Sequence, residues 1–259
     1  MSSIGVVFAE SRRKALVAYV TVGYPTVEST LAIVPLLAEC GCDIVELGVP
    51  FSDPLADGAT IQEASHQALQ TGVTPQTCLE VAEQIRQKTD VALAFMTYYN
   101  PVLHYGLEVF CTACAKAGVE GLIVPDLPPD ESTDLDNAAR NHGLDLIFLL
   151  TPTSTTERIR LVVEKSRGFV YVVSLLGVTG ARDSLPTGLR DFVGRIRQET
   201  AKPLCVGFGI STPDQARQVG QLADGVIVGS RLVQLIRDDK PPYESVTSFV
   251  RGLRVALDQ

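Results

Sequence analysis

Three carboxylates lie within one short stretch, "VELGVPFSDPLADGAT", which begins as a buried apolar run and ends as a loop. Glu46 stands inside the apolar run, and Asp53 and Asp57 follow in the loop. A carboxylate in apolar surroundings costs on the order of several kcal/mol unless it is paired or stays protonated. A carboxyl group whose pKa is shifted in this way can exchange protons near neutral pH. The stretch therefore indicates general acid–base chemistry at Glu46.

The two loop aspartates also have ordinary structural explanations. Asp57 precedes a helical pattern, so either it or Thr60 is a candidate cap for that helix. Asp53 comes directly before Pro54, which is typical of a turn. The same loop position would also let Asp57 reach over toward Glu46. The residues alone leave both interpretations of Asp57 open.

Eight short runs rich in Val, Ile and Leu must position these carboxylates. Their near-continuous apolar character is typical of strands that are buried on both faces in a parallel sheet. Amphipathic helical stretches alternate with them, and several begin at a capping Ser, Thr or Asp. The predicted strands are Ala15–Gly23, Cys42–Pro50, Val91–Tyr99, Gly121–Asp126, Asp145–Thr151, Phe169–Ser174, Pro203–Ile210 and Ala223–Ser230.

Eight strands that alternate with helices in 259 residues fit a closed (β/α)8 TIM barrel of the α/β class. We expect residues 1–259 to form this barrel as a single domain with extra helices. An open doubly wound sheet is the alternative, but no GxGxxG loop follows the first strand, where such a fold places its dinucleotide site.

Strand alternation predicts which way Glu46 points. In the second strand, one set of apolar residues suits the helix-facing side, namely Val45, Leu47 and Val49. Ile44, Glu46 and Gly48 then face the barrel interior. Glu46 would lie near the carboxyl end of its strand, which is the end where the active sites of barrels lie.

Three glycine-rich stretches follow the late strands, at 175–182 ("LLGVTGAR"), 207–212 ("GFGIST") and 228–231 ("VGSR"). Glycine lets the backbone approach a ligand closely, and the amides at a helix N-terminus bind anions. Many barrels build a phosphate site from the loops after strands seven and eight. The stretches together predict a site for a small phosphate-bearing substrate, with Thr179 in a loop that closes over it.

The overall charge argues against a nucleic-acid partner. The formal net charge is −8, the pI is about 4.9, and the sequence contains no cluster of basic residues that could bind nucleic acid. No apolar run reaches the roughly 18 residues of a membrane span, so we expect no membrane partner. We find no secretory signal at the N-terminus and expect a cytoplasmic protein, with an organelle-targeted precursor trimmed at its start as the alternative.

The six cysteines include a CxxC pair, Cys111 and Cys114. Both fall in a helical pattern, and no second CxxC or suitably spaced His pair completes a metal site. Free cysteine is among the most buried residue types, so we expect these residues to be small members of the core.

These stretches together resemble the tryptophan synthase α subunit family. Residues 46–62, "ELGVPFSDPLADGATIQ", match the most specific motif of the family. The segments "YVTVGYP", "MTYYNPV", "PDLP", "GVTGAR", "GFGIS" and "VGS" occur in the expected order and spacing, so the resemblance covers essentially the whole chain. It implies retro-aldol cleavage of indole-3-glycerol phosphate to indole and glyceraldehyde 3-phosphate. It also implies that no cofactor or metal takes part in this subunit.

The resemblance implies roles for individual residues. Glu46 would be the acid/base that protonates the indole C3 and takes the proton of the glycerol hydroxyl, and Asp57 would stay ionised beside the indole N–H. Tyr171 would contact substrate, with an ordinary barrel-core aromatic as the alternative, and Thr179 would approach Asp57 when a lid closes. The implied indole pocket is Tyr19, Met96, Ile123 and Ile227, and the implied phosphate ligands are Gly180, Gly209, Gly229 and Ser230.

The resemblance also implies a partner. In the family, a β subunit that uses pyridoxal phosphate joins indole to serine, and the complex is an α2β2 heterotetramer. The residues expected to face it are Asp53, Pro54, Asn100 and Pro101. Three alternatives are a lyase that acts alone and releases indole, a catalytically silent barrel that regulates a partner, and another phosphate-binding barrel such as a phosphosugar isomerase. The Glu46–Asp57 pair argues against the second, and "PFSDPLADG" argues against the third.

Overall fold

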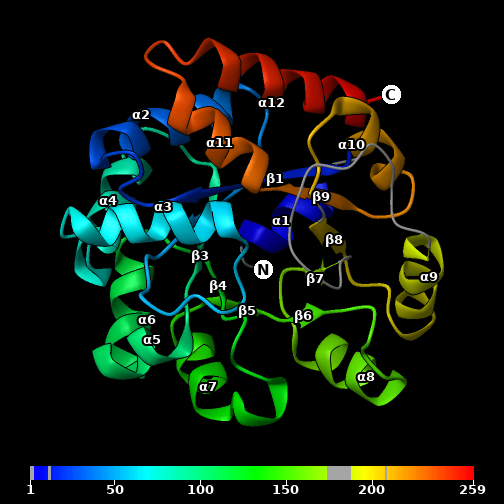
Figure 1. Ribbon diagram of the computed structural model, residues 1–259. Coiled ribbons are helices and arrows are strands. Elements are labelled where there is room, and N and C mark those ends of the chain that lie inside the picture. Colours follow the sequence, from blue (N-terminus) through cyan, green and yellow to red (C-terminus); the bar gives the residue numbers. More distant parts are fainter. Residues whose placement is uncertain (1–2, 11–12, 174–187, 208) are drawn as a thin grey trace.

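The strands of the computed structural model form one parallel sheet that curves into a barrel (Figure 1). The structure describes residues 3–10, 13–173, 188–207 and 209–259. The strand order in the sheet is β5-β4-β3-β2-β1-β9-β8-β7-β6. The strands are β1 (Ala15–Thr21), β2 (Ile44–Gly48), β3 (Ala92–Met96), β4 (Gly121–Ile123), β5 (Asp145–Ile147), β6 (Leu149–Leu150), β7 (Val170–Val173), β8 (Leu204–Gly207) and β9 (Gly225–Val228).

The two ends of this strand order, β5 and β6, are halves of one barrel strand. Only Phe148 separates them, and its buried N–H donates to Ser166 Oγ at 3.0 Å instead of to a neighbouring strand. Counting them together turns nine segments into eight strands, and the sheet closes on itself. The predicted (β/α)8 barrel is confirmed, and the doubly wound alternative is wrong.

Helices surround the barrel and join successive strands (Figure 1). Two of them begin with a capping box at a threonine, Thr74 and Thr212, followed by a proline at the first helical position. The helices are α1 (Ser3–Glu10), α2 (Val27–Glu39), α3 (Ala59–Gln70), α4 (Pro75–Arg86), α5 (Tyr99–Tyr105), α6 (Leu107–Lys116), α7 (Thr133–Asn141), α8 (Thr156–Lys165), α9 (Leu189–Glu199), α10 (Pro213–Gly220), α11 (Ser230–Asp238) and α12 (Glu244–Leu257), with a 3-10 turn, η1, at Pro129–Glu131.

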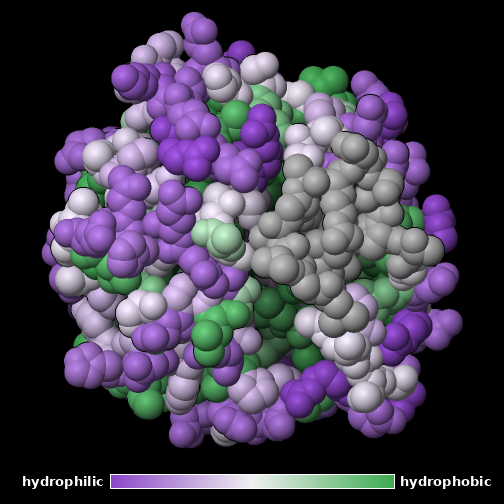
Figure 2. Space-filling view, in the orientation of Figure 1, coloured by the Kyte–Doolittle hydropathy of each residue, from purple (hydrophilic) through white to green (hydrophobic). Residues whose placement is uncertain are grey.

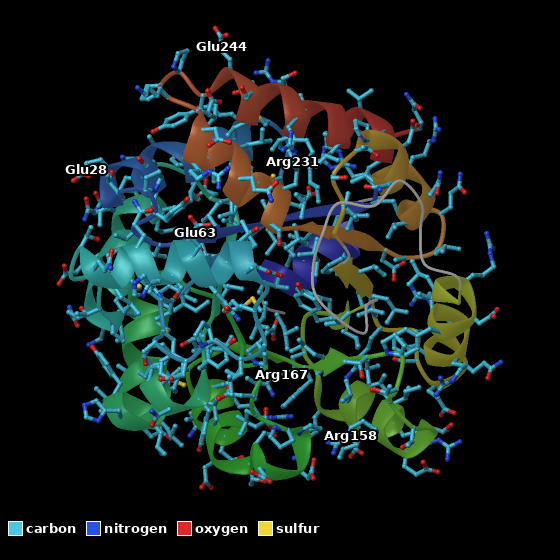
Figure 3. The ribbon with its side chains drawn as sticks, viewed as in Figure 1. Glu28, Glu63, Arg158, Arg167, Arg231 and Glu244 are labelled. Atoms are coloured by element: carbon cyan, nitrogen blue, oxygen red, sulfur yellow. The ribbon has the colours of Figure 1, made fainter. Side chains whose placement is uncertain are left out.

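Ion pairs join the connecting segments outside the barrel. Arg158 of α8 lies 2.5 Å from Asp130 in η1, and Arg167 lies 2.5 Å from Asp136 of α7 (Figure 3). The Arg158–Asp130 pair is exposed and the Arg167–Asp136 pair is partly buried. Both lie outside the barrel, whose interior is held by apolar packing.

The apolar packing has two layers. One layer lies between strands and helices and includes Val45, Leu47 and Val49, while the other fills the barrel interior and includes Ile44. The predicted alternation along β2 is therefore confirmed, with the even-numbered residues inside the barrel.

Helix α1, which the sequence did not predict, closes the amino-terminal end of the barrel. Its Ile4 is fully buried in the interior layer. A Cβ at Gly121 or at Gly168 would lie 2.5 Å or 2.7 Å from Ile4, so glycine at both positions makes room for the helix. Both glycines stand at or just before the start of a strand, and the opposite, carboxyl end remains for the site.

Several other expectations can be compared with the structure. The predicted strands run too long at their carboxyl ends, and α5 begins at Tyr99, which we had placed in a strand. All six cysteines are free and buried, as predicted. Within the described residues, no helix is long and apolar enough to cross a membrane.

Candidate active site at the carboxyl ends of the strands

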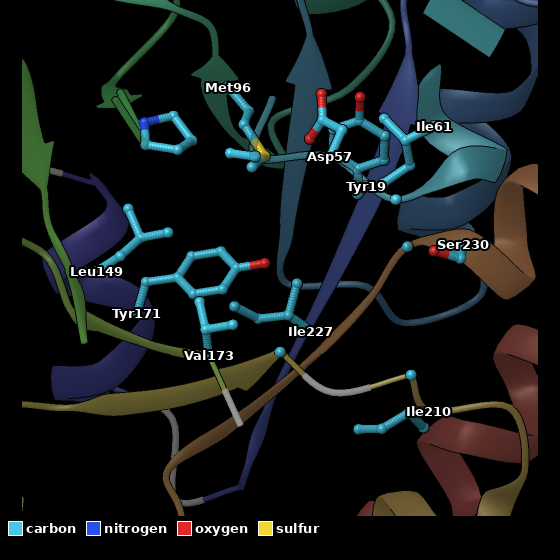
Figure 4. Close-up of a pocket in the computed structure, with 16 residues that line it drawn as sticks. Tyr19, Asp57, Ile61, Met96, Leu149, Tyr171, Val173, Ile210, Ile227 and Ser230 are labelled. Carbon is cyan, nitrogen blue, oxygen red and sulfur yellow. The ribbon is translucent and has the colours of Figure 1, made fainter. Parts of the chain in front are cut away.

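A cavity lies at the carboxyl ends of the strands, and the space in it and in its open mouth amounts to about 850 Å³ (Figure 4). Figure 2 shows apolar side chains gathered in a hollow at the centre of this face. Apolar walls with a few polar groups are typical of a site for a small organic ligand. The predicted site residues that line it are Tyr19, Asp57, Met96, Tyr171, Gly209, Ile227, Gly229 and Ser230.

One residue of the predicted indole pocket does not line the cavity. Ile123 is fully buried in the barrel interior beside Met96 and does not line the cavity. Thr179 and Gly180 lie outside the described residues. The walls also contain Ile61, Leu149 and Val173, which the sequence analysis missed. Val173 could have been found, because it is two residues after Tyr171 on one strand and therefore shares its face.

Glu46 lies in the barrel interior, as predicted, but it does not form part of the cavity wall. It is 0% exposed, and among the described residues neither of its oxygens has a hydrogen-bond partner. Its strand register places it level with Tyr19, and its charge also acts on Tyr171 and Cys205. Burial raises the pKa of Glu46 to about 8, so the group is mostly protonated at neutral pH.

Asp57 reaches the same cavity from the loop between β2 and α3. Burial raises its pKa to about 6, and a hydrogen bond from the Tyr98 hydroxyl acts in the opposite direction. Asp57 is therefore mostly ionised at neutral pH while Glu46 is mostly protonated. The residue at the N-cap of α3 is Gly58, with no side-chain cap, so Asp57 does not cap that helix. The capping interpretation is wrong.

Three side chains hold the loop that carries Asp57. Ser65 Oγ accepts from Phe51 N at 2.9 Å and donates to Phe51 O at 3.2 Å. Gln62 Nε2 donates to the carbonyl of Asp57 at 2.9 Å. The hydroxyl of Tyr98, at the end of β3, accepts from Ala56 N at 2.9 Å. Sequence analysis had noted the "MTYYNPV" segment but gave Tyr98 no role.

The two tyrosines of the cavity each lie over a glycine. A Cβ at Gly48 would lie 2.1 Å from the Tyr19 hydroxyl oxygen, and a Cβ at Gly207 would lie 2.7 Å from Tyr171 Cε1. Burial is the main cause that raises the pKa of both phenols, and the nearby carboxylates Glu46 and Asp57 raise it further. Both tyrosines are therefore neutral hydrogen-bonding groups beside the two carboxyl groups.

Another part of the cavity wall consists of backbone and the start of a helix, and it adjoins Tyr19 at Gly229. Gly209, Gly229 and Ser230 lie there, and Ser230 is the first residue of α11 (Figure 4). No lysine or arginine is among the described residues that line the cavity. An anion at this wall would be held by backbone N–H groups, the Ser230 hydroxyl and the helix dipole. Within the described part of the chain, no group of three or more His, Cys, Asp or Glu side chains could hold a metal ion.

Comparisons with known proteins show the family to which the chain is similar. The sequence profile of the family described as "Tryptophan synthase alpha chain" matches residues 7–253. A protein of that name from Dehalococcoides mccartyi is 59% identical over 96% of this chain and 98% of its own length, and one from Geobacter sulfurreducens is 49% identical over 99% of each.

Solved structures show the same likeness. A chain of Mycobacterium tuberculosis tryptophan synthase has a TM-score of 0.93 at 42% identity, covering 100% of this chain and 99% of its own. The tryptophan synthase subunit alpha from Legionella pneumophila has a TM-score of 0.89 at 32% identity, covering 100% and 99%. The barrel, the cavity and these full-length similarities lead to one conclusion: the chain belongs to the tryptophan synthase alpha chain family.

Proposed function

We propose that the cavity binds indole-3-glycerol phosphate and that Glu46 and Asp57 cleave it to indole and glyceraldehyde 3-phosphate. The chain is a lyase of tryptophan biosynthesis by its family, and the assignment of roles to its residues is our own. One contrast carries that assignment: Glu46 is fully buried with no hydrogen-bond partner among the described residues, whereas Asp57 lines the cavity, and this difference leaves Glu46 mostly protonated and Asp57 mostly ionised at neutral pH.

The substrate would lie across the cavity. Its phosphate would bind at Gly209, Gly229 and Ser230, and its indole ring would pack between Tyr19 and Met96 and against Ile227. Asp57 would accept a hydrogen bond from the indole N–H. Glu46 would approach from the adjoining interior layer, which requires its side chain to rotate into the cavity because it has no exposed surface. The neutral Tyr171 hydroxyl would contact the glycerol chain.

The reaction would proceed in two proton transfers through one group. Protonated Glu46 donates its proton to indole C3, and the positive charge that forms on the ring nitrogen is stabilised by ionised Asp57. The Glu46 carboxylate then takes the proton of the hydroxyl next to the breaking bond. The O–H electrons form the carbonyl, the C–C electrons return to the ring, and Glu46 is protonated again.

The exposed side of the Asp57 loop is a candidate partner surface. Asp53 and Leu55 of the loop are exposed, Leu55 to 92%, and so are Asn100 and Leu103 of α5, Leu103 to 54%. Exposed large apolar side chains of this kind are typical of an interaction site. We propose that this surface, with Pro54 and Pro101, binds a tryptophan synthase β subunit in an α2β2 complex, and that pyridoxal phosphate belongs to that partner.

An indole-release assay on the purified chain, with and without a β subunit, tests the proposal. Release that the β subunit stimulates supports it, whereas equal and rapid release in both conditions supports a stand-alone lyase, and no release in either supports a silent regulatory barrel. Glu46→Gln should lower kcat/KM by about 10²–10⁴-fold, because an amide cannot transfer the proton. Exposed Glu83→Gln on α4 is the matched control, and parental activity in Glu46→Gln would contradict the role of Glu46.

A further inference from the structure

The carboxyl group of Glu46 has no hydrogen-bond donor in its buried position. The residue has no exposed surface, and neither oxygen has a partner in the described part of the chain. Proton transfer in the cavity requires the side chain to turn toward the carboxyl end of β2. A carboxylate formed there without a donor would be costly, because apolar surroundings disfavour its charge. A donor near the path of this movement would therefore assist the reaction.

The Tyr19 hydroxyl lies on the side toward which Glu46 must turn. Tyr19 of β1 is level with Glu46 of β2 in the strand register, so both side chains leave their strands toward the barrel interior. The Tyr19 ring leans toward the cavity that it lines, because its hydroxyl oxygen lies over Gly48, the next inward-facing position of β2 (Figure 4). The hydroxyl is thus one inward-facing position closer to the cavity than Glu46.

The hydroxyl is also within reach of the carboxyl group. Successive inward-facing positions on one strand are about 6.6 Å apart. A glutamate side chain that extends along its strand covers more than half of this distance, and a hydrogen bond of about 2.7 Å covers the rest. Gly48 has no side chain that would block the path, and the Tyr19 hydroxyl occupies the space that such a side chain would fill.

The Tyr19 hydroxyl has the capacity for a second partner. Its one partner within the described residues is Thr21 Oγ1, at 3.3 Å. A phenol hydroxyl has one proton and two lone pairs, so it can accept from Thr21 and donate to a carboxylate oxygen at the same time.

We propose that Tyr19 is a positioning residue for Glu46, whose hydroxyl donates to one carboxyl oxygen once the side chain has turned toward the cavity. This inference rests on the proposed role of Glu46. The other oxygen gives its proton to indole C3 and then takes the proton of the glycerol hydroxyl, while the bond to Tyr19 stabilises the carboxylate that exists between the two transfers. A neutral phenol is a weaker donor than an ammonium or guanidinium group, so the carboxyl group can still turn between the two substrate atoms.

Tyr19→Phe removes the hydroxyl and keeps the ring that lines the cavity. We expect kcat for indole release to fall about tenfold, the size of one hydrogen bond to a charged group, and KM to stay close to the parental value. The same change in the Glu46→Gln background should lower kcat little, because the residual reaction does not use a carboxylate at position 46. Single-turnover measurements with enzyme in excess give the rates of the slow variants.

Two controls separate positioning from packing. Thr21→Val removes the present partner of the Tyr19 hydroxyl but keeps the hydroxyl itself, so it should lower kcat much less than Tyr19→Phe does. Tyr105→Phe removes a phenol hydroxyl that donates to Gln76 Oε1 at 2.9 Å on the surface, and it should leave kcat and KM unchanged. Circular dichroism and thermal unfolding of each variant verify that it is folded.

The outcomes distinguish this inference from the proposed function. Parental kcat in Tyr19→Phe, with or without a rise in KM, would overturn the positioning role, and so would an equal loss of kcat in Thr21→Val. A full tenfold loss from Tyr19→Phe in the Glu46→Gln background would also overturn it, because Tyr19 would then act independently of the carboxyl group. Parental activity in Glu46→Gln would instead overturn the role of Glu46 itself.

Discussion

Gly48 and Tyr19 occupy neighbouring strands in such close approach that no larger residue fits at the glycine. A Cβ at Gly48 would lie 2.1 Å from the Tyr19 hydroxyl oxygen and 2.6 Å from Cζ. The ring is 5% exposed, and its hydroxyl pairs with Thr21 Oγ1 at 3.3 Å. The position of the Tyr19 ring, one wall of the cavity, thus depends on the absence of a side chain two residues after Glu46.

We therefore expect Gly48→Ala to displace Tyr19 and narrow the indole pocket. Overpacking of this kind lowers the free energy of unfolding by about 1–3 kcal/mol, and KM for the substrate should rise. The double variant with Tyr19→Leu should lose less free energy of unfolding than the sum of the two single variants, because the smaller side chain removes the clash. Chemical denaturation and the indole assay measure both effects, and strict additivity would show that the two residues are not coupled.

The two carboxyl groups predict a bell-shaped dependence of kcat/KM on pH. Asp57 must be ionised, which gives an acid limb near its pKa of about 6, and Glu46 must be protonated, which gives a base limb near its pKa of about 8. A phosphate monoester also titrates near pH 6, with a pKa of about 6. An acid limb that survives in Asp57→Asn therefore belongs to the substrate, and a flat profile from pH 7 to 9 would contradict the assignment of Glu46.

Burial of Glu46 should also make the protein less stable as pH rises. The folded state keeps the Glu46 proton up to a pKa of about 8, whereas the unfolded chain loses it near 4.5. Between these values the folded state binds more protons, so the free energy of unfolding falls by about 1.4 kcal/mol per pH unit.

Glu46→Gln should not show this fall in the free energy of unfolding, because its amide does not titrate. The raised pKa of Asp57 changes the stability of the parent and the variant equally. The stability of the variant relative to the parent should thus improve between pH 5 and pH 7.5, by on the order of 3 kcal/mol. Denaturant unfolding at both pH values gives the difference directly. A constant difference would mean that Glu46 is not protonated in the folded protein.

Because Ser230 begins helix α11 at the proposed phosphate site, its substitution should weaken substrate binding and leave the chemical step unchanged. Ser230→Ala removes a hydroxyl at the N-terminus of α11, and a hydrogen bond to a charged group is worth about 1.5–3 kcal/mol. We expect KM to rise roughly tenfold or more, with kcat little changed. Exposed Ser245 on α12 provides the matched control. A fall in kcat with unchanged KM would place Ser230 outside the phosphate site.

The sequence patterns predicted the barrel and the inward direction of Glu46, because strand alternation and burial on both faces are local properties. They left Asp57 undecided between a cap and a functional group, since a loop residue's direction depends on contacts with distant segments. Tyr98 was missed for the same reason: its partner, Ala56, is separated from it by 42 residues. Helix α1 was missed because its Ile4 packs against Gly121 and Gly168, which are distant in the sequence and which no local pattern reveals.

The carboxyl group of Glu46 is bound to nothing else within the described residues, and this freedom has a mechanistic consequence. A group held by a strong donor would be oriented toward one substrate atom and would resist turning to a second. A carboxyl group without such a partner can donate its proton to the ring carbon and then accept one from the hydroxyl, because it can rotate about its own side-chain bonds. The apolar surroundings of Glu46 thus keep the carboxyl group protonated and also leave it free to rotate between the two proton transfers.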